Sequence, residues 1–179
     1  MAGNFKYLEF FILLLFCINC NNSATNKETV GQEIINQNFD RFMIHLPYFS
    51  FKDSPVIVYS DVSTKDNFFT DECAFCFDKI NLEGFQINNN SKYIFFNIEV
   101  LPKYSNSHKI KLKKRNEVRA KEYISLEFSN FYIDTKINKA FIIVESEAHG
   151  HKGGSLDVYF FKKQNNSWLF YKKTNLAIM

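Results

Sequence analysis

The sequence predicts an α+β domain in which an N-terminal helix packs on a curved antiparallel sheet that ends in a β-meander. Three observations predict this class. Aromatic residues make up 17% of the chain, with 21 Phe and 9 Tyr, and such side chains suit strands. Apolar residues recur at helical spacing near the N-terminus, and they alternate with polar residues in the C-terminal third. The length of 179 residues suits one domain, expected over 29–179.

The composition excludes several classes of protein. Apolar residues at 46% and charged residues at 23% are typical of a globular domain, not of a disordered or multi-span membrane protein. The net charge of +3 is too small to indicate a nucleic-acid partner, and no RNA-binding motif accompanies it. The sequence contains no nucleophile elbow, phosphate loop or dinucleotide fingerprint, so it predicts no catalytic residue and no cofactor.

Residues 1–19 are interpreted as a signal peptide. The uninterrupted apolar run from Phe10 to Ile18 has the length of a signal-peptide core, roughly 7–15 residues. It is shorter than the about 20 residues that a membrane-spanning helix needs. Lys6 supplies a single positive charge before the run. The alternative is a buried N-terminal helix of the domain, which the abrupt change to polar residues after Cys20 disfavours.

Cys20 is the predicted lipidation site. Residues 16–20, Phe-Cys-Ile-Asn-Cys, resemble the relaxed lipobox of Bacteroidota lipoproteins, although asparagine stands where a small residue usually precedes the cysteine. Acylation with palmitate or a similar chain would hold the protein on a membrane surface without spanning it, and 20–28 would form a polar tether. Two alternatives stay open. Cys17 is a second possible acceptor, and a plain signal-peptidase cut after Ala24 would give a secreted protein.

Cys73 and Cys76 are the cysteines that remain in an exported chain. In an oxidising compartment, such a pair is expected to form a local disulfide. A thioredoxin-like redox pair is the rival, but such a pair closely follows a strand, and the nearest predicted strand ends well upstream at Ser60. A zinc half-site would need a second pair, which the sequence lacks. Two reduced or loosely paired loop cysteines are the remaining alternative.

The N-terminal helix is expected to begin at Thr29 and to end before Pro47. Thr29 and Gln32 match a capping box, in which each side chain satisfies a backbone amide of the first turn. A proline disfavours helical backbone in the residue before it. The apolar residues between these ends recur at spacings of three and four, which places them on one core-facing side: Ile35, Phe39, Phe42, Met43 and Leu46.

Two strands and a basic segment are expected next. Pro55–Ser60 is a short apolar run that suits a buried strand, and Tyr93–Leu101 is rich in Ile, Phe and Val. Residues 61–90 are expected to form loops, a short helix and the cysteine pair. Lys109–Lys121 concentrates positive charge and is interpreted as a solvated loop or an edge strand guarded by lysine. Contact with anionic lipid head groups or an acidic partner is its functional alternative.

The C-terminal third predicts an antiparallel meander. Its four strands are expected at 124–128, 140–147, 156–163 and 168–173. Polar turns are expected at Asp134–Lys139 and at Asn165–Asn166, since asparagine tolerates positive φ. One face of such a sheet must be covered, and the helix is the expected cover. Trp168, the single tryptophan, is expected to close the end of the core, with an exposed ligand anchor as its alternative.

The segment from Phe128 onward resembles the C-terminal portion of small uncharacterised lipoproteins of flavobacteria and related Bacteroidota, and the N-terminal helix bearing Ile34-Ile35-Asn36 resembles theirs too. The resemblance covers about half of the chain. The C-terminal segments that carry it are Lys139-Ala-Phe-Ile-Ile-Val144, Gly150, Gly153-Gly154, Tyr159-Phe-Phe-Lys-Lys163, Asn166, Trp168 and Phe170. Those proteins often carry cysteines around the glycine-rich connection, and this chain has none there. The resemblance implies a helix-plus-curved-sheet cone similar to NTF2-like domains, and it implies no activity.

One constellation could carry chemistry. Glu145, Glu147, His149 and His151 fall at alternate positions, so they share one face if the strand continues through Gly150. A His-x-His pair with a carboxylate is a common way to hold zinc or a similar metal. A glycine invites a bend, and a solvated strand end is the alternative interpretation.

Two classes of function follow from the sequence. The first is a non-catalytic binding or interaction lipoprotein of the cell envelope that faces the periplasm. Its partner would be another envelope protein or a small ligand in the mouth of the sheet. The second is an enzyme or a metal-binding protein that uses a curved-sheet pocket with His149 and His151. A largely apolar pocket favours the first class, and a pocket that holds these histidines and a carboxylate favours the second.

Overall fold

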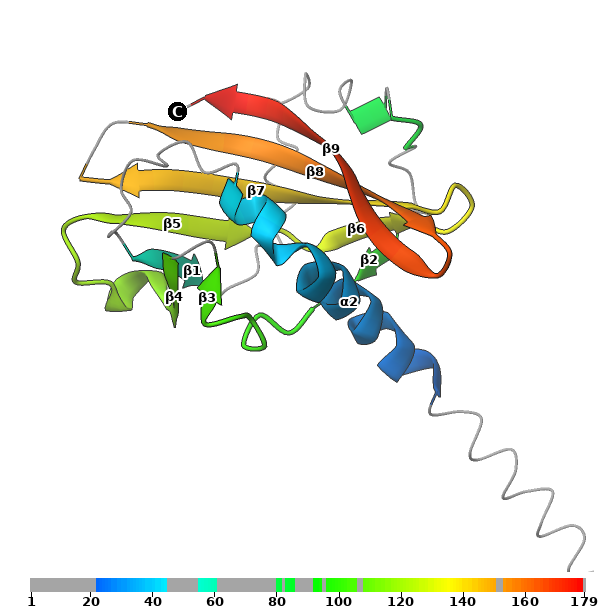
Figure 1. Cartoon of the computed structure of the whole chain (residues 1–179), viewed down its shortest axis with the longest axis horizontal. Coiled ribbons are helices and arrows are strands. Elements are labelled where there is room, and N and C mark those ends of the chain that lie inside the picture. The colour runs from blue at the N-terminus through cyan, green and yellow to red at the C-terminus, as the bar shows by residue number, and fades with distance from the viewer. Residues whose placement is uncertain are drawn as a thin grey trace, which may run out of the picture.

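The described part of the chain forms an α+β structure in which one long helix packs on a nine-stranded sheet (Figure 1). The computed structural model describes residues 22–44, 55–60, 80–81, 83–85, 92–94, 96–105, 108–150 and 153–178. The elements are α2 (Asn22–Ile44), β1 (Val56–Tyr59), β2 (Lys92–Ile94), β3 (Tyr104–Ser105), β4 (His108–Lys113), the 3-10 helix η3 (Arg115–Glu117), β5 (Tyr123–Phe128), β6 (Phe131–Asp134), β7 (Lys139–His149), β8 (Gly154–Gln164) and β9 (Ser167–Ile178).

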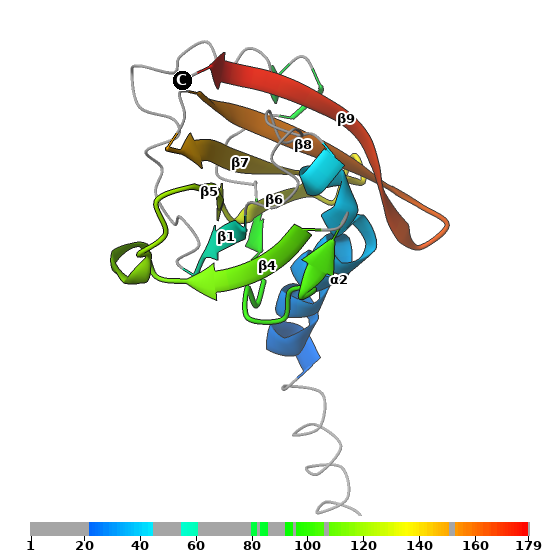
Figure 2. The same ribbon diagram turned by 60° about the vertical axis from the view of Figure 1, so that its left-hand side comes forward.

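The long strand β7 organises the sheet. Along one side it pairs with β5 and β6 in succession, and along the other side it pairs with β8, which pairs with β9. Beyond β5 lie β1, β4 and β3, and β1 is parallel to both β4 and β5. The other pairings are antiparallel, so the predicted meander of β5, β7, β8 and β9 is confirmed. Figure 2 shows that the sheet curves, with α2 against its inner face.

Strand β6 was not expected. Ser129 ends β5 by bonding back to Ile143 of β7: its amide donates to the Ile143 carbonyl at 2.9 Å, and its hydroxyl accepts from the Ile143 amide at 2.9 Å. The chain then re-enters the sheet at Phe131 as β6. The polar turn that follows was predicted correctly, since Asp134 accepts from the Lys136 amide at 2.8 Å.

Helix α2 begins at Asn22, so the predicted start at Thr29 is wrong and most of the expected tether is helical. Residues Asn22–Val30 include no proline or glycine, the two residue types that most strongly disfavour helical backbone, so the helix can extend through them. The Gln32 side chain does not cap the helix. Its amide nitrogen donates to the Val100 carbonyl at 3.0 Å, and its oxygen accepts from the Asn97 amide at 3.1 Å.

The apolar side of α2 forms the main core with the inner face of the sheet, as predicted. Ile35, Phe39, Phe42 and Met43 are all buried, and Leu46 and Pro47 lie outside the described residues. The Phe42 ring is 5.2 Å from the Phe128 ring and 4.7 Å from the Tyr159 ring, centroid to centroid, in edge-to-face geometry. Such contacts contribute about 0.5–1.5 kcal/mol each beyond burial of their area.

Trp168 is buried in this core, which confirms the predicted role and not that of an exposed anchor. The backbone around it bonds directly to α2. The Asn38 side chain donates to the Trp168 carbonyl at 2.9 Å and accepts from the Phe170 amide at 3.1 Å, and the Trp168 amide donates to Gln37 at 3.2 Å. Asn165 and Asn166 form the predicted tight turn before β9, both with positive φ.

The predicted strand over Tyr93–Leu101 is mostly wrong. Strand β2 covers only Lys92–Ile94, and a turn follows at Asn97–Val100. The Asn97 side chain accepts from the Glu99 amide at 2.9 Å, a local bond by which asparagine stabilises turns. Phe96 and Ile98 are nevertheless buried in the main core, so their apolar character reflected burial and not strand geometry.

The outer face of the sheet carries a second apolar cluster beside its polar part. The cluster consists of Ile80, Phe85, Tyr132, Phe141, Ile143, Val158, Phe160 and Leu176. Phe85 meets Phe141 edge-to-face at 4.9 Å, so the short turn around residues 80–85 covers part of this face. Strand β1 was predicted correctly and all four of its residues are buried.

Candidate functional site

The candidate site is the polar part of the outer face, where β5 and β7 run side by side. The register places Tyr123 opposite His149, Ser125 opposite Glu147, and Glu127 opposite Glu145. These side chains point away from α2, because the residues that alternate with them on both strands face the inner side. The arrangement brings together three of the four residues predicted as a possible metal site, Glu145, Glu147 and His149.

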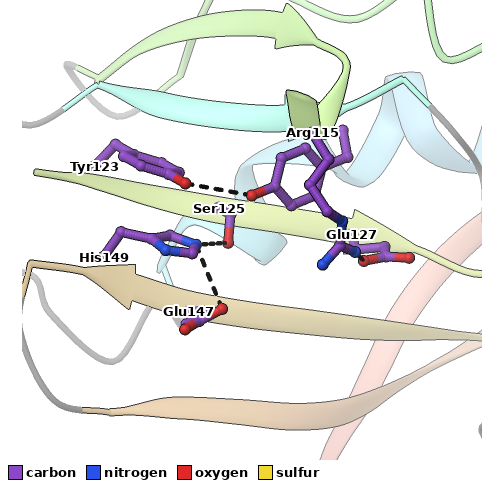
Figure 3. A network of polar contacts seen from close by, with 7 residues as sticks. Arg115, Tyr123, Ser125, Glu127, Glu147 and His149 are labelled. Carbon is purple, nitrogen blue, oxygen red and sulfur yellow. Dashed lines mark hydrogen bonds and ion pairs between the residues drawn. The ribbon is translucent and has the colours of Figure 1, made fainter. Parts of the chain in front are cut away.

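His149 is the centre of the site (Figure 3). Its Nε2 atom lies 2.9 Å from the Ser125 hydroxyl and 3.3 Å from a carboxylate oxygen of Glu147. Its ring stacks on the Tyr123 ring, with centroids 4.1 Å apart and 12° between the planes. The imidazole is therefore held by one hydroxyl, one carboxylate and one aromatic ring.

A second set of contacts extends the site toward β1 and η3. The Tyr123 hydroxyl lies 3.4 Å from the Tyr59 hydroxyl, and the Arg115 guanidinium stands 4.6 Å above the Tyr59 ring. Arg115 also forms an ion pair with Glu127 across the sheet surface (Figure 3). Burial, followed by the bond with Tyr59, raises the pKa of Tyr123 to about 12, so this phenol stays neutral at physiological pH.

Three carboxylates of the site, those of Glu127, Glu145 and Glu147, lie close together on one face of the sheet. Glu127 and Glu145 are direct cross-strand partners, and Glu147 lies next along the same face. Partial burial, and then the neighbouring charge of Glu127, raise the pKa of Glu145 above its ordinary value of 4.5. Arg115 acts in the opposite direction, because its positive charge favours the ionised carboxylate.

Gly150 ends β7 and separates the two predicted histidines. It adopts a φ of +89°, which L-residues rarely adopt, and a Cβ there would lie 2.8 Å from a side-chain carbon of Glu122. The strand therefore stops at His149, and His151 lies outside the described residues. Within the described part of the chain, no three His, Cys, Asp or Glu side chains are arranged to hold a metal ion.

The contacts of Ser125 and His149 differ from those of a nucleophilic serine. The serine is only 4% exposed, so its hydroxyl cannot reach a substrate. The Ser125 hydroxyl and the Glu147 carboxylate both contact Nε2, whereas a triad needs its carboxylate on the other ring nitrogen. The hydrogen bonds instead fix the histidine in place on the sheet.

Several residues of this site were missed by sequence reasoning. Ser125 and Glu127 were recognised only as the polar half of an alternating strand, and Tyr59 only as part of an apolar run. Arg115 was counted as one charge of a basic segment. The alternation was a usable signal for the face, but the cross-strand register that brings these residues to His149 was not visible in the sequence.

A separate polar cluster lies on the inner face, away from this site. Asp157 is 2% exposed and accepts from Ser155 at 2.7 Å and from Asn175 at 3.1 Å, while Lys173 forms an ion pair with it at 3.0 Å. The Ser146 hydroxyl bonds to Ser155 at 3.0 Å. This carboxylate is well satisfied, as a buried charge must be, so the cluster supports the structure of β7, β8 and β9.

Comparison with protein-family models, with curated proteins and with solved structures gives no match. None of the helices in the described ranges is both long enough and apolar enough to cross a membrane. The predicted lipidation site Cys20 and the predicted disulfide pair Cys73 and Cys76 lie outside the described residues.

Proposed function

We propose that this protein is a cell-envelope lipoprotein that is anchored through Cys20, faces the periplasm and acts as a non-catalytic binding module. Support for the anchor comes from the apolar run Phe10–Ile18 and the cysteine just after it. The partner is another envelope protein or a small ligand. We also expect Cys73 and Cys76 to be disulfide-bonded in that compartment, so thiol labelling without reductant should find neither free.

One observation carries the binding role. The polar part of the outer face holds arginine, tyrosine and histidine side chains in fixed positions, and its one hydroxyl nucleophile is buried. The Arg115 side chain is 65% exposed and that of Glu147 is 49% exposed, so both are open to a partner. Arginine and tyrosine are enriched among residues that dominate binding energy at interfaces. A preorganised polar surface of this kind favours recognition over covalent catalysis.

We infer that the architecture is cone-like, similar to NTF2-like domains. The curved sheet around α2 supports this inference (Figure 2). The inner face is filled by aromatic side chains, among them Phe39, Phe42 and Phe161, and His149 belongs to the opposite face. Recognition is therefore assigned to the outer face and not to the space between helix and sheet.

A site-specific photo-crosslinker tests the binding role in cells. Placed at position 147, it should capture one discrete envelope protein or ligand, and Arg115→Ala should abolish that product. The same group at Lys136, an exposed turn residue, is the matched control. Identical products from both positions, or no product from position 147, would show that the outer face is not the recognition surface.

A metal-binding role is the second candidate, because Glu147 and His149 already lie 3.3 Å apart. Zinc titration of the full chain followed by calorimetry tests it. Stoichiometric binding that is lost in both His149→Ala and His151→Ala would favour this role over simple recognition. If zinc does not bind stoichiometrically, the metal-binding role is wrong and recognition remains as the single proposed role.

A further inference from the structure

Positive charge is concentrated in one segment of the chain. Residues 103–122 contain eight of the 22 Lys and Arg residues but only two of the 19 Asp and Glu residues. The whole chain has a net charge of +3, so everything outside this segment is net negative. The segment consists of β4, η3 and the residues that flank them. Positive charge is therefore unevenly distributed along the chain, although the total charge is small.

Most of these charges are exposed, and Arg119 donates to the backbone carbonyls of Asn116 and Val118. Lys109 and Lys111 of β4 are exposed, and so are Lys114, Arg119 and Lys121 beyond it. Among the described residues, the only ion pair made by the segment is that of Arg115 with Glu127. The exposed lysines can therefore meet an external anion, which a role in folding alone would not require.

Two large apolar side chains are exposed in the same part of the chain. Leu112 of β4 is 37% exposed, and Val100 in the preceding turn is 54% exposed. The bond between Gln32 and the Val100 carbonyl holds this turn against α2. Lysines beside exposed aliphatic side chains are the combination found on surfaces that sit at a membrane interface.

The segment lies on the side from which the N-terminal end of α2 projects. In both views β3 and β4 are on the lower side of the sheet, opposite β9, and the blue end of α2 extends past them in that direction (Figures 1 and 2). Ser105 of β3 bonds to Asp40 of α2, which fixes this ribbon to the helix. Cys20 is two residues before Asn22, and two residues span at most about 7 Å. A lipid on Cys20 would therefore enter the membrane close to the N-terminal end of α2.

We propose that this basic edge, defined as Lys103, Lys109, Lys111, Lys113, Lys114, Val100 and Leu112, rests on an anionic membrane surface. The proposal depends on the anchor of the proposed function for its orientation, and it adds a second contact with the same bilayer. Each lysine near an anionic surface strengthens the association by roughly fivefold, and a salt-screened contact of this kind falls off beyond a Debye length.

Chemical footprinting of lysines on the full chain tests the proposal. The protein is bound to vesicles of phosphatidylcholine alone or mixed with anionic phosphatidylglycerol, and a water-soluble acylating reagent labels accessible amines. On anionic vesicles, labelling of Lys109, Lys111 and Lys113 should fall several-fold relative to neutral vesicles, while Lys136 and Lys162 stay unchanged as internal controls. Salt at about 0.5 M should restore it, because the Debye length is then only a few ångströms. Equal labelling on both kinds of vesicle would overturn the proposal and favour an acidic protein partner.

A matched pair of variants separates this contact from the anchor. The triple change of Lys109, Lys111 and Lys113 to Gln should weaken salt-sensitive binding to anionic vesicles by at least tenfold. The control variant, in which Lys136, Lys162 and Lys163 are changed to Gln, should bind anionic vesicles as the parent does. Equal weakening in the two triple variants would contradict the proposal. If the extracted protein carries no lipid yet shows this specific protection, the anchor fails and the basic edge stands. If it carries lipid but shows no protection, only the basic edge fails.

Discussion

Two edges of the sheet, β9 and β4, are protected in different ways. Along β9, the buried Asn38 side chain bonds to the backbone of Trp168 and Phe170, so α2 takes the place of a neighbouring strand. Along β4, the two-residue strand β3 is the one strand among the described residues that pairs with the edge, and exposed lysines project from the rest. Charge on an edge strand prevents pairing with other sheets and leaves the strand available to an oppositely charged surface.

This difference separates stability from recognition. The β9 edge is joined to α2 through buried groups, so changes there should lower the free energy of unfolding. The β4 edge is solvated, so changes there should alter binding and leave folding nearly intact. Substitutions at the two edges should therefore differ in their effect on the free energy of unfolding, which is largest for buried residues of the β9 edge and smallest for lysines of the β4 edge.

Trp168→Ala should cause the largest loss. Replacing so large a buried side chain typically costs about 3–5 kcal/mol, a large share of the roughly 5–15 kcal/mol that holds most domains folded. Urea unfolding measures it, and the parent should show blue-shifted emission that acrylamide quenches poorly, since Trp168 is buried. An unchanged midpoint would contradict the role given to the β9 edge.

Asn38→Ala should cost about 2–3 kcal/mol, because it leaves one buried carbonyl and one backbone amide of β9 unsatisfied. Gln37→Ala is the matched control on the same helix. Gln37 is exposed and bonds only to the Trp168 amide of this edge, so its loss should cost about 1 kcal/mol or less. Equal losses for both variants would show that Asn38 does not replace a strand.

Glu145→Gln should flatten the pH dependence of stability. The folded pKa of Glu145 is raised above 4.5, so folding favours its protonated form. The stability that this group contributes is fully present below the unfolded pKa and is lost as the pH rises through the folded pKa. Urea unfolding from about pH 4 to pH 7 should therefore show a decline in the parent that is smaller in the variant. A steeper decline in Glu145→Gln would contradict the assigned direction.

The triple change of Lys109, Lys111 and Lys113 to Gln should have the smallest effect on folding. Surface substitutions away from buried features usually change the free energy of unfolding by less than about 0.5 kcal/mol. Circular dichroism during urea unfolding measures this, and a large loss would mean that these lysines serve the fold. Sedimentation should in turn show more self-association, because the edge has lost its protecting charge.

Much of the fold could be predicted from local patterns. The alternating strands of the meander, the apolar side of α2 and the tight turn at Asn165–Asn166 are set by residues close together in the sequence. The errors have a common physical cause. Gln32 fits a capping box but bonds to the distant Asn97 turn, and Ser129 divides one strand into two by bonding to Ile143. In both cases a contact between segments far apart in the sequence determined the local structure.

The candidate site could be predicted only in part. The period of two correctly placed Glu145, Glu147 and His149 on one face of β7. It could not show that Ser125 and Tyr123 stand opposite them, because cross-strand register depends on the whole sheet. The ion pair of Arg115 with Glu127 could not be predicted either, because a run of basic residues does not indicate which side chain will contact the sheet.

We propose that a lipid at Cys20 holds the protein at the membrane, and the proposed contact of the basic edge depends on this anchor for its orientation. The most direct test is the intact mass of the protein extracted from membranes. We predict the mass of residues 20–179 plus a diacyl or triacyl modification, and loss of that species in Cys20→Ser. An unmodified mass that begins after Ala24, or one that still contains residues 1–19, would contradict the account.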